Sequence, residues 1–241
     1  MRETIDGAVR RQRVAVAVAV VVGLLWGAVA ASARTSGPVA LLTLVPIAVL
    51  LWATFRVFSR HGAGELRADE PERAFFAPPP NRASYLWLLL SFLTYTTAYQ
   101  LMVEREGMWW LYPVLSGPCA LVLSIALWRR VSTVALTPDG IAAEGPLRQL
   151  WVPWEALDPA VAGASYRHSG QLRLPVRKWD LVRLRGIAPR RSAIVETAEL
   201  DVTPGLLAGA VAHYAAHPEH RAAIGTPQEY ARLGQALAGE G

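Results

Sequence analysis

The chain is poor in the residues that build disulfide frameworks and charged surfaces. Cys119 is the only cysteine among 241 residues, and Lys178 is the only lysine among the 24 basic residues. A single cysteine excludes an intrachain disulfide framework and a cysteine-rich zinc site. Charged residues make up 18% of the chain, against about 25% in a typical soluble domain. The charge deficit falls mainly in the N-terminal half, which indicates a membrane-embedded part followed by a separate domain.

Motifs that mark common enzymes are also missing. The chain contains no Walker loop, no GxGxxG and no GxSxG, and its acids form no pattern that suggests a catalytic cleft. We therefore expect a protein that is not an enzyme, with no catalytic residue and no cofactor.

What the N-terminal half does contain is a set of long apolar runs. None of these runs carries a charge, and each is near the length of about 20 residues that a transmembrane helix needs. An arginine at the centre of such a helix costs roughly 3 kcal/mol, so four uncharged runs predict a bundle of four α-helical spans. The runs cover residues 14–31, 38–55, 85–103 and 108–128.

The basic residues between these runs predict the orientation. Four arginines precede the first run, one lies in the first connection, five lie in the second, one lies in the third, and two follow the last run. Since cytoplasmic loops are rich in arginine and lysine, this alternation predicts a multi-pass plasma-membrane protein with both termini in the cytoplasm. Trp109, Trp110 and Tyr112 would anchor the last span outside, and Trp128 would anchor it inside.

The first run has an alternative interpretation. Arginines, an apolar stretch and the small residues at 31–33 also resemble a signal peptide with its cleavage site. The run exceeds the usual apolar length of about 7–15 residues, which favours an uncleaved span. Within it, Gly23, Gly27 and Ala31 form a row of small residues that either lets a neighbouring helix approach closely or reflects composition alone.

No run contains an ionisable side chain, which argues against an ion pathway or a proton relay. The one long connection, residues 56–84, is punctuated by glycine and proline, and we expect a cytoplasmic linker with a short helix near residues 65–76. A membrane enzyme or a transporter accessory subunit, with a site between the spans and this 56–84 loop, stays open as an alternative function.

Residues 131–241 have the pattern of a folded domain with strands and helices. Thr137-Pro138-Asp139-Gly140 has the composition of a tight turn, so the runs at 131–136, 141–144 and 149–152 predict an antiparallel meander. Further strands are expected at 171–174, 179–184 and 193–202. Apolar spacing predicts a helix over 205–217, and Thr226 with Glu229 forms a capping box for a last helix over 227–237.

Three short segments of this domain resemble a known family. Residues 135–141 (ALTPDGI), 152–157 (VPWEAL) and 214–221 (YAAHPEHR) are similar to actinobacterial integral membrane proteins with a C-terminal bacterial pleckstrin-homology-like (PH-like) domain. The resemblance implies an α+β fold, in which a bent antiparallel sheet is capped by a C-terminal helix. Residues 158–170 depart from the family pattern, since they lack strand character. Independently of the family, Trp154 is expected to be a core anchor whose indole N–H needs a partner.

Charge is uneven within this domain. Eight basic residues but only one acid lie between residues 167 and 191. A basic surface gains about 1 kcal/mol per residue close to an anionic leaflet, so we expect contact with anionic membrane lipids, or else an acidic protein partner or a second copy of the chain. A solvated arginine-rich face explains the charges equally well. No nucleic acid is expected, because aromatic residues are not interleaved with the basic ones. The expected contact residues are Arg173, Arg177, Lys178, Arg183, Arg185, Arg190 and Arg191.

Histidines cluster near the C-terminus. His213 and His217 are four residues apart, which is a spacing that metal ligands use on a helix, and His220 follows after Pro218. HExxH is absent, and the proline should interrupt the helix before His220, so we expect polar residues at a helix end and no metal site.

Overall fold

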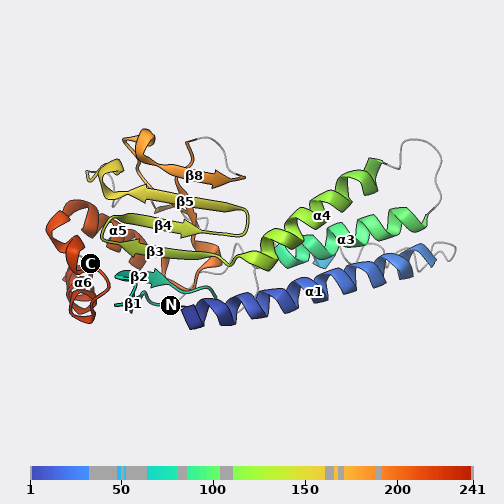
Figure 1. The fold of residues 1–241 in the computed structure, drawn as a ribbon, viewed down its shortest axis with the longest axis horizontal. Coiled ribbons are helices and arrows are strands. Elements are labelled where there is room, and N and C mark those ends of the chain that lie inside the picture. Colours follow the sequence, from blue (N-terminus) through green and yellow to red (C-terminus); the bar gives the residue numbers. More distant parts are fainter. Residues whose placement is uncertain are drawn as a thin grey trace. The chain divides into compact units, whose positions relative to one another are not determined.

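The chain divides into two compact units, each of which is described by itself. The computed structural model describes residues 2–32, 48–49, 52, 64–80, 86–103, 111–160, 166–167, 171–187 and 191–239. The β-rich unit comprises Met1–Ala8, Arg60–Asn81 and Val131–Gly241, and the helical unit comprises Val9–Ser59 and Arg82–Arg130. Figure 1 shows the elements of both units along the chain.

The helical unit is built from three described helices, α1 (Arg2–Ser32), α3 (Leu86–Met102) and α4 (Leu111–Arg129). Two of them, α1 from Thr4 onward and α4, are long and apolar enough to cross a membrane. With 17 residues, α3 would extend for only about 26 Å, which is less than the hydrocarbon core of about 30 Å. The predicted span at 38–55 lies largely outside the described residues. Of the four predicted spans, two are thus shown as candidates in the part of the chain that the structure describes.

The apolar side chains of α1 and α4 point largely outward. Most of the large hydrophobic residues exposed in the described part of the chain are on these two helices. Water is a poor solvent for continuous apolar surface of this kind, whereas lipid is a good one. Strongly exposed examples are Val14, Leu25, Leu115 and Leu121.

Two glycines let α1 and α3 approach closely, which favours the first of the two interpretations of the small-residue row. A Cβ atom on Gly27 would lie 2.7 Å from the Ala98 Cβ atom and 2.9 Å from the Tyr95 carbonyl oxygen. A Cβ atom on Gly23 would lie 2.5 Å from the Ser91 carbonyl oxygen. These separations are shorter than van der Waals contact, so only glycine fits at either position.

The β-rich unit contains a six-stranded antiparallel sheet in the order β1-β2-β3-β4-β5-β8. The expected meander is confirmed. Thr137 pairs with Gly140 across a two-residue turn, and Gly140 pairs with Pro153. A Cβ atom on Gly140 would overlap the Val152 carbonyl oxygen, which explains the glycine at this turn. The strands are β1 (Arg67–Asp69), β2 (Ala74–Ala77), β3 (Thr133–Thr137), β4 (Gly140–Glu144), β5 (Arg148–Pro153) and β8 (Arg183–Gly186).

The first two strands come from the connection that was expected to be a linker. Instead of a short helix near 65–76, the chain forms a β-hairpin whose second strand pairs with β3, with Phe75 opposite Leu136. The hairpin turn packs on the C-terminal segment. Arg73 donates a hydrogen bond of 3.0 Å to the Ala222 carbonyl oxygen, and Gly225 adopts a φ of 97° beside the Arg73 backbone. This placement differs from the expected domain boundary at residue 131, because residues 64–80 belong to the sheet.

A second, three-stranded sheet has the order β6-β7-β9 and is formed by β6 (Tyr166–Arg167), β7 (Gln171–Arg173) and β9 (Ile194–Glu196). Two expected strands are shorter than predicted. Residues 179–181 form a 3-10 helix, η6 (Trp179–Leu181), before β8 begins. Strand β9 ends at Glu196, where a second 3-10 turn, η7 (Thr197–Glu199), follows.

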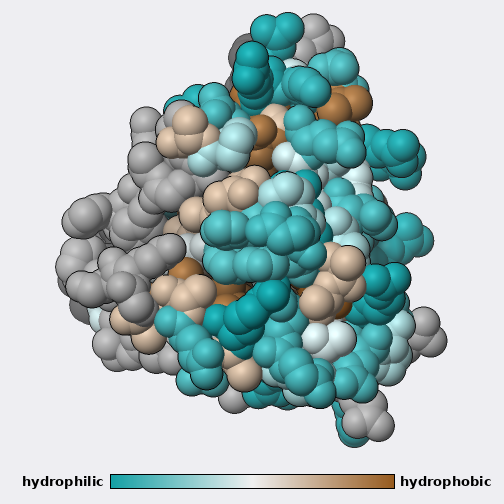
Figure 2. Space-filling model, turned by 90° about the vertical axis from the view of Figure 1, so that its left-hand side faces the viewer, coloured by the Kyte–Doolittle hydropathy of each residue, from teal (hydrophilic) through white to brown (hydrophobic). Residues whose placement is uncertain are grey.

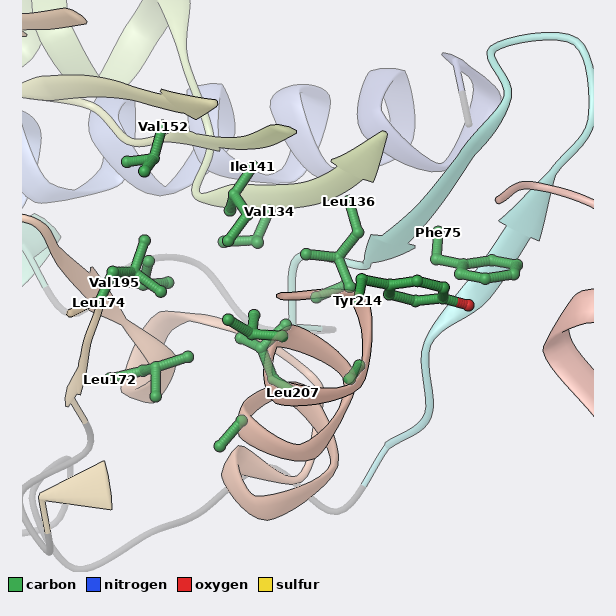
Figure 3. Close-up of a cluster of buried hydrophobic side chains, with 14 of the residues drawn as sticks. Phe75, Val134, Leu136, Ile141, Val152, Leu172, Leu174, Val195, Leu207 and Tyr214 are labelled. Carbon is green, nitrogen blue, oxygen red and sulfur yellow. The ribbon is translucent and has the colours of Figure 1, made fainter. Parts of the chain in front are cut away.

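Helix α5 (Pro204–Ala216) packs its apolar face on both sheets. Figure 3 shows Leu207 and Tyr214 pointing toward Val134, Leu136 and Ile141 of the large sheet and toward residues of the small sheet. This burial of one helix stripe against strand side chains is what holds the unit together.

Trp154 is the core anchor that was expected, in the 3-10 helix η4 (Trp154–Ala156) that follows β5. Its side chain is 4% exposed, and its indole N–H donates a 2.8 Å hydrogen bond to the Thr137 carbonyl oxygen. The last helix, α6 (Pro227–Gly239), begins behind Thr226, whose hydroxyl oxygen accepts the Glu229 backbone N–H at 3.3 Å. The predicted helices at the C-terminus are therefore confirmed.

Candidate functional site

Strand β8 forms one edge of the large sheet and exposes an alternating row of side chains. Arg183 and Arg185 are exposed, whereas Val182 and Leu184 pack against the core. Exposed apolar residues flank the strand on both sides, since Leu181 at the end of η6 is 36% exposed and Ile187, which follows Gly186 with its φ of 96°, is 72% exposed. They are the only large hydrophobic residues exposed among the described residues of the β-rich unit. We call Leu181, Arg183, Arg185 and Ile187 the β8 row.

The other expected contact residues are spread over the unit. Arg177 and Lys178 are exposed just before η6, where both backbone N–H groups donate to the Ala156 carbonyl oxygen at 2.8 and 3.2 Å. Arg173 is on strand β7 of the small sheet. Arg191 is in a turn, where its backbone φ is 57°. Arg190 lies outside the described residues. The structure thus places Arg183 and Arg185 in one row and does not join all seven basic residues into it.

Three histidine rings gather where α5 ends, which the sequence analysis did not expect. The 3-10 helix η8 (Pro218–Ala223) begins directly after His217 and turns His220 back toward α5. The ring centroids of His213, His217 and His220 lie 4.9 to 5.1 Å apart. The His213 Nε2 and His220 Nδ1 atoms are 3.0 Å apart in a hydrogen bond between the rings. The face of the unit on the side of α5 and α6 is largely hydrophilic (Figure 2).

Two carboxylates flank these rings. Glu219 Oε1 lies 3.2 Å from His217 Nδ1 and 3.7 Å from His220 Nε2. Glu229 is 3% exposed, and it accepts the Tyr214 hydroxyl at 2.9 Å and pairs with Arg232 at 2.5 Å. The histidine cluster is therefore bordered by one exposed and one buried acid.

Burial and charge set the protonation of this region. Burial, followed by the neighbouring His217 and His220, lowers the pKa of His213, which keeps its ring neutral at pH 7. A hydrogen bond from its own backbone N–H, and another from His217, lower the pKa of Glu219. Burial and the hydrogen bond to Glu229 raise the pKa of Tyr214. At neutral pH, the cluster thus contains a neutral His213 ring and an ionised Glu219 carboxylate.

Comparisons of the chain with protein-family models, with curated proteins and with solved structures find no match. The geometry of the described residues therefore carries the functional argument.

A separate hollow of about 450 Å³ lies within the β-rich unit, and its lining includes Glu65 and Arg67 near the hairpin, Asp201, and Tyr230 of α6. Burial, together with the charge of Glu65, raises the pKa of Tyr230. Among the described residues, the hollow is lined in part by the segment 56–84 but by no residue of α1, α3 or α4, so it leaves the alternative function, with a site between the spans and this loop, untested.

Sequence reasoning found the arginines of the β8 row but missed its apolar ends. Leu181 and Ile187 lie just outside β8, in η6 and after the positive-φ Gly186, so the two-residue period of the strand does not extend to them. Their exposure depends on the tertiary structure. The histidine cluster was missed because Pro218 was read only as a helix stop, although proline also fits the first turn of a new helix.

Proposed function

We propose that this chain is a non-enzymatic integral protein of a bacterial plasma membrane, whose β-rich unit is a cytoplasmic PH-like module that contacts the anionic surface of the membrane. The observation that carries this proposal is the β8 row, in which two exposed arginines stand between two exposed apolar side chains. The antiparallel sheets and the core helix α5 support the PH-like assignment at the level of architecture.

The chemistry of the β8 row suits a lipid surface better than water. Each basic residue near an anionic leaflet gains about 1 kcal/mol, and an exposed Ile or Leu gains further free energy by entering the interface. An acidic protein would satisfy the arginines equally well, but it would leave the apolar ends of the row without a comparable partner. Lipid is therefore the partner that we propose.

Strand pairing supports a four-span topology. The hairpin of β1 and β2 precedes α3, and β3 follows α4, yet β2 and β3 are hydrogen-bonded neighbours. Paired strands lie on the same side of a membrane, so if α4 crosses the bilayer, α3 crosses it as well. The same reasoning requires a second crossing between α1 and the hairpin when the arginine-rich N-terminus is cytoplasmic, and the apolar run at 38–55 is the crossing that the sequence predicts there.

This topology predicts which positions a membrane-impermeant maleimide reaches in intact cells. In a Cys119→Ala background, single cysteines at Ser36 and Gly107 are expected to react from outside. Single cysteines at Ala68 and Gln235 are expected to react only after the cells are permeabilised. Labelling of Ala68→Cys in intact cells would contradict the topology, and labelling of the Cys119→Ala parent sets the background.

If the β8 row contacts lipid, anionic lipid should slow the amide hydrogen exchange of this segment. With the full-length chain in nanodiscs, we expect residues 181–187 to exchange amide hydrogen more slowly in phosphatidylglycerol-containing bilayers than in phosphatidylcholine bilayers. The double substitution Arg183→Gln/Arg185→Gln is expected to remove most of this difference, because about 2 kcal/mol of attraction is lost with two charges. Hydrogen exchange followed by mass spectrometry measures the effect.

Arg67→Gln is the matched control for this experiment. It removes one exposed arginine from β1, the strand at the opposite edge of the same sheet. It is expected to leave the lipid-dependent protection of residues 181–187 unchanged. Equal protection in neutral and anionic bilayers for the unsubstituted chain would overturn the proposed lipid contact.

A further inference from the structure

The junction between α5 and η8 brings three potential metal ligands together. His217 caps α5, Pro218 starts the 3-10 helix, and Glu219 and His220 follow directly. The ligand atoms of His217, Glu219 and His220 all lie within 4.8 Å of one another. Two imidazoles and one carboxylate are a ligand set that zinc and its neighbours use in proteins.

The distances match the edges of a metal coordination shell. With metal–ligand bonds of about 2.0–2.1 Å, the corners of a tetrahedron lie about 3.3 Å apart. Glu219 Oε1 lies 3.2 Å from His217 Nδ1 and 3.7 Å from His220 Nε2. An ion placed between these atoms would replace one hydrogen bond, between His217 and Glu219, and one longer contact, between His220 and Glu219, with coordinate bonds, and it would need only small side-chain shifts.

We propose that His217 Nδ1, His220 Nε2 and Glu219 Oε1 form a binding site for a divalent transition-metal ion of the zinc class. The three ligands leave a fourth position of a tetrahedral shell for water or another ligand, and the exposure of His217 and Glu219 leaves the site accessible from solvent.

His213 acts as a positioning residue for this site. Its Nε2 atom lies 3.0 Å from His220 Nδ1. When His220 Nδ1–H donates to His213, the lone pair of His220 is on Nε2, the nitrogen that faces Glu219. Metal-binding histidines commonly hold their orientation through such a hydrogen bond from the second ring nitrogen.

Glu229, the buried acid beside the histidines, is a less suitable metal ligand. His213, His220 and Glu229 also have ligand atoms within 4.8 Å of one another. However, Glu229 already accepts the Tyr214 hydroxyl and pairs with the Arg232 guanidinium, so an ion there would have to displace a cation from a buried carboxylate. In the exposed set, the ion-pair contacts of Glu219 are with His217 and His220 themselves, so an ion would not displace a buried cation.

The test uses full-length protein in detergent, purified without a polyhistidine tag and stripped of metal with a chelator. Addition of Co²⁺ is expected to produce visible absorption bands that saturate at about one ion per chain, and Zn²⁺ is expected to displace them. The double substitution His217→Ala/His220→Ala is expected to abolish the bands. His213→Phe keeps an aromatic ring at this position but removes the ring nitrogen atoms. It should weaken Co²⁺ affinity by about 10–100-fold at unchanged stoichiometry.

The two histidines outside the cluster, His61 and His168, provide matched controls. His61→Ala and His168→Ala should bind Co²⁺ as the unsubstituted chain does. Circular dichroism of each variant checks that the fold is retained. The proposal is overturned if the unsubstituted chain gives no cobalt bands, or if His217→Ala/His220→Ala binds Co²⁺ as tightly as the unsubstituted chain.

Discussion

Replacing Phe75 with alanine is expected to destabilise the β-rich unit by about 3–5 kcal/mol, which is the usual cost of removing a buried phenylalanine. Phe75 is 0% exposed. Its ring centroid lies 5.6 Å from that of Tyr230 and 6.3 Å from that of Tyr214. The loss is large because one side chain of the hairpin fills the space between β3, α5 and α6. An unstructured linker at residues 64–80 would show no such loss.

The measurement is hydrogen exchange of the β3–β5 amides at rising urea concentration, with the full-length chain in detergent. Ile187→Ala is the control, since a side chain that is 72% exposed should change stability by less than about 0.5 kcal/mol. If Phe75→Ala leaves the urea midpoint of these amides unchanged, the hairpin is not part of the sheet.

Gly27→Ala and Gly23→Ala are each expected to destabilise the helical unit by about 1–3 kcal/mol, the typical cost of adding a methyl group to a filled contact. At Gly27, the new Cβ atom would lie 2.7 Å from the Ala98 Cβ atom, and the backbone of α3 blocks any simple relief. At Gly23, the obstacle is again α3, through Thr94 and the Ser91 carbonyl oxygen. Unfolding of the detergent-solubilised chain by sodium dodecyl sulfate, followed by circular dichroism, measures the loss.

Gly117→Ala in α4 is the same chemical change without the obstacle. A Cβ atom there would lie 3.7 Å from Thr97 Cγ2, which is ordinary contact. Because alanine is favoured over glycine in a helix by about 0.5–1 kcal/mol, this variant should be neutral or slightly more stable. Equal losses at Gly27 and Gly117 would show that close packing of α1 on α3 is not the cause.

Local chemistry explains which parts of the fold could be predicted. The meander of β3, β4 and β5 was predictable because the turn at Pro138 and Asp139 has its own sequence signature. The helices α5 and α6 were predictable for the same reason, since apolar spacing and the Thr226 cap are local features. The indole hydrogen bond of Trp154 follows from the general need to satisfy a buried N–H.

Long-range pairing explains what could not be predicted. The segment that holds β1 and β2 has charges at 65, 67, 69 and 70, which suggested a helix, and its strand partner β3 lies beyond two apolar helices in the sequence. No short-range pattern encodes such a pairing, because it is stabilised by the core that Phe75 joins. The strand expected over 179–184 was also predicted in the wrong place. Residues 179–181 form η6, and the strand, β8, starts only at Arg183.

The candidate sites were predictable only in part. The excess of arginine between residues 167 and 191 was visible, but tertiary structure distributes these residues over two sheets and several turns. The histidines were visible as well, and their stacking depends on the geometry of η8 after Pro218, which sequence spacing does not specify.

The pairing of β2 with β3 also constrains the order of events during biosynthesis. The hairpin leaves the ribosome before α3 and α4, and its partner strand leaves after them. If both helices insert into the membrane as proposed, completion of the sheet must wait until the insertion machinery has handled them, and the exposed edge of β2 needs protection in the meantime. Under the same proposal, insertion of only one of the two helices would leave β2 and β3 on opposite sides of the bilayer, and the sheet could not form.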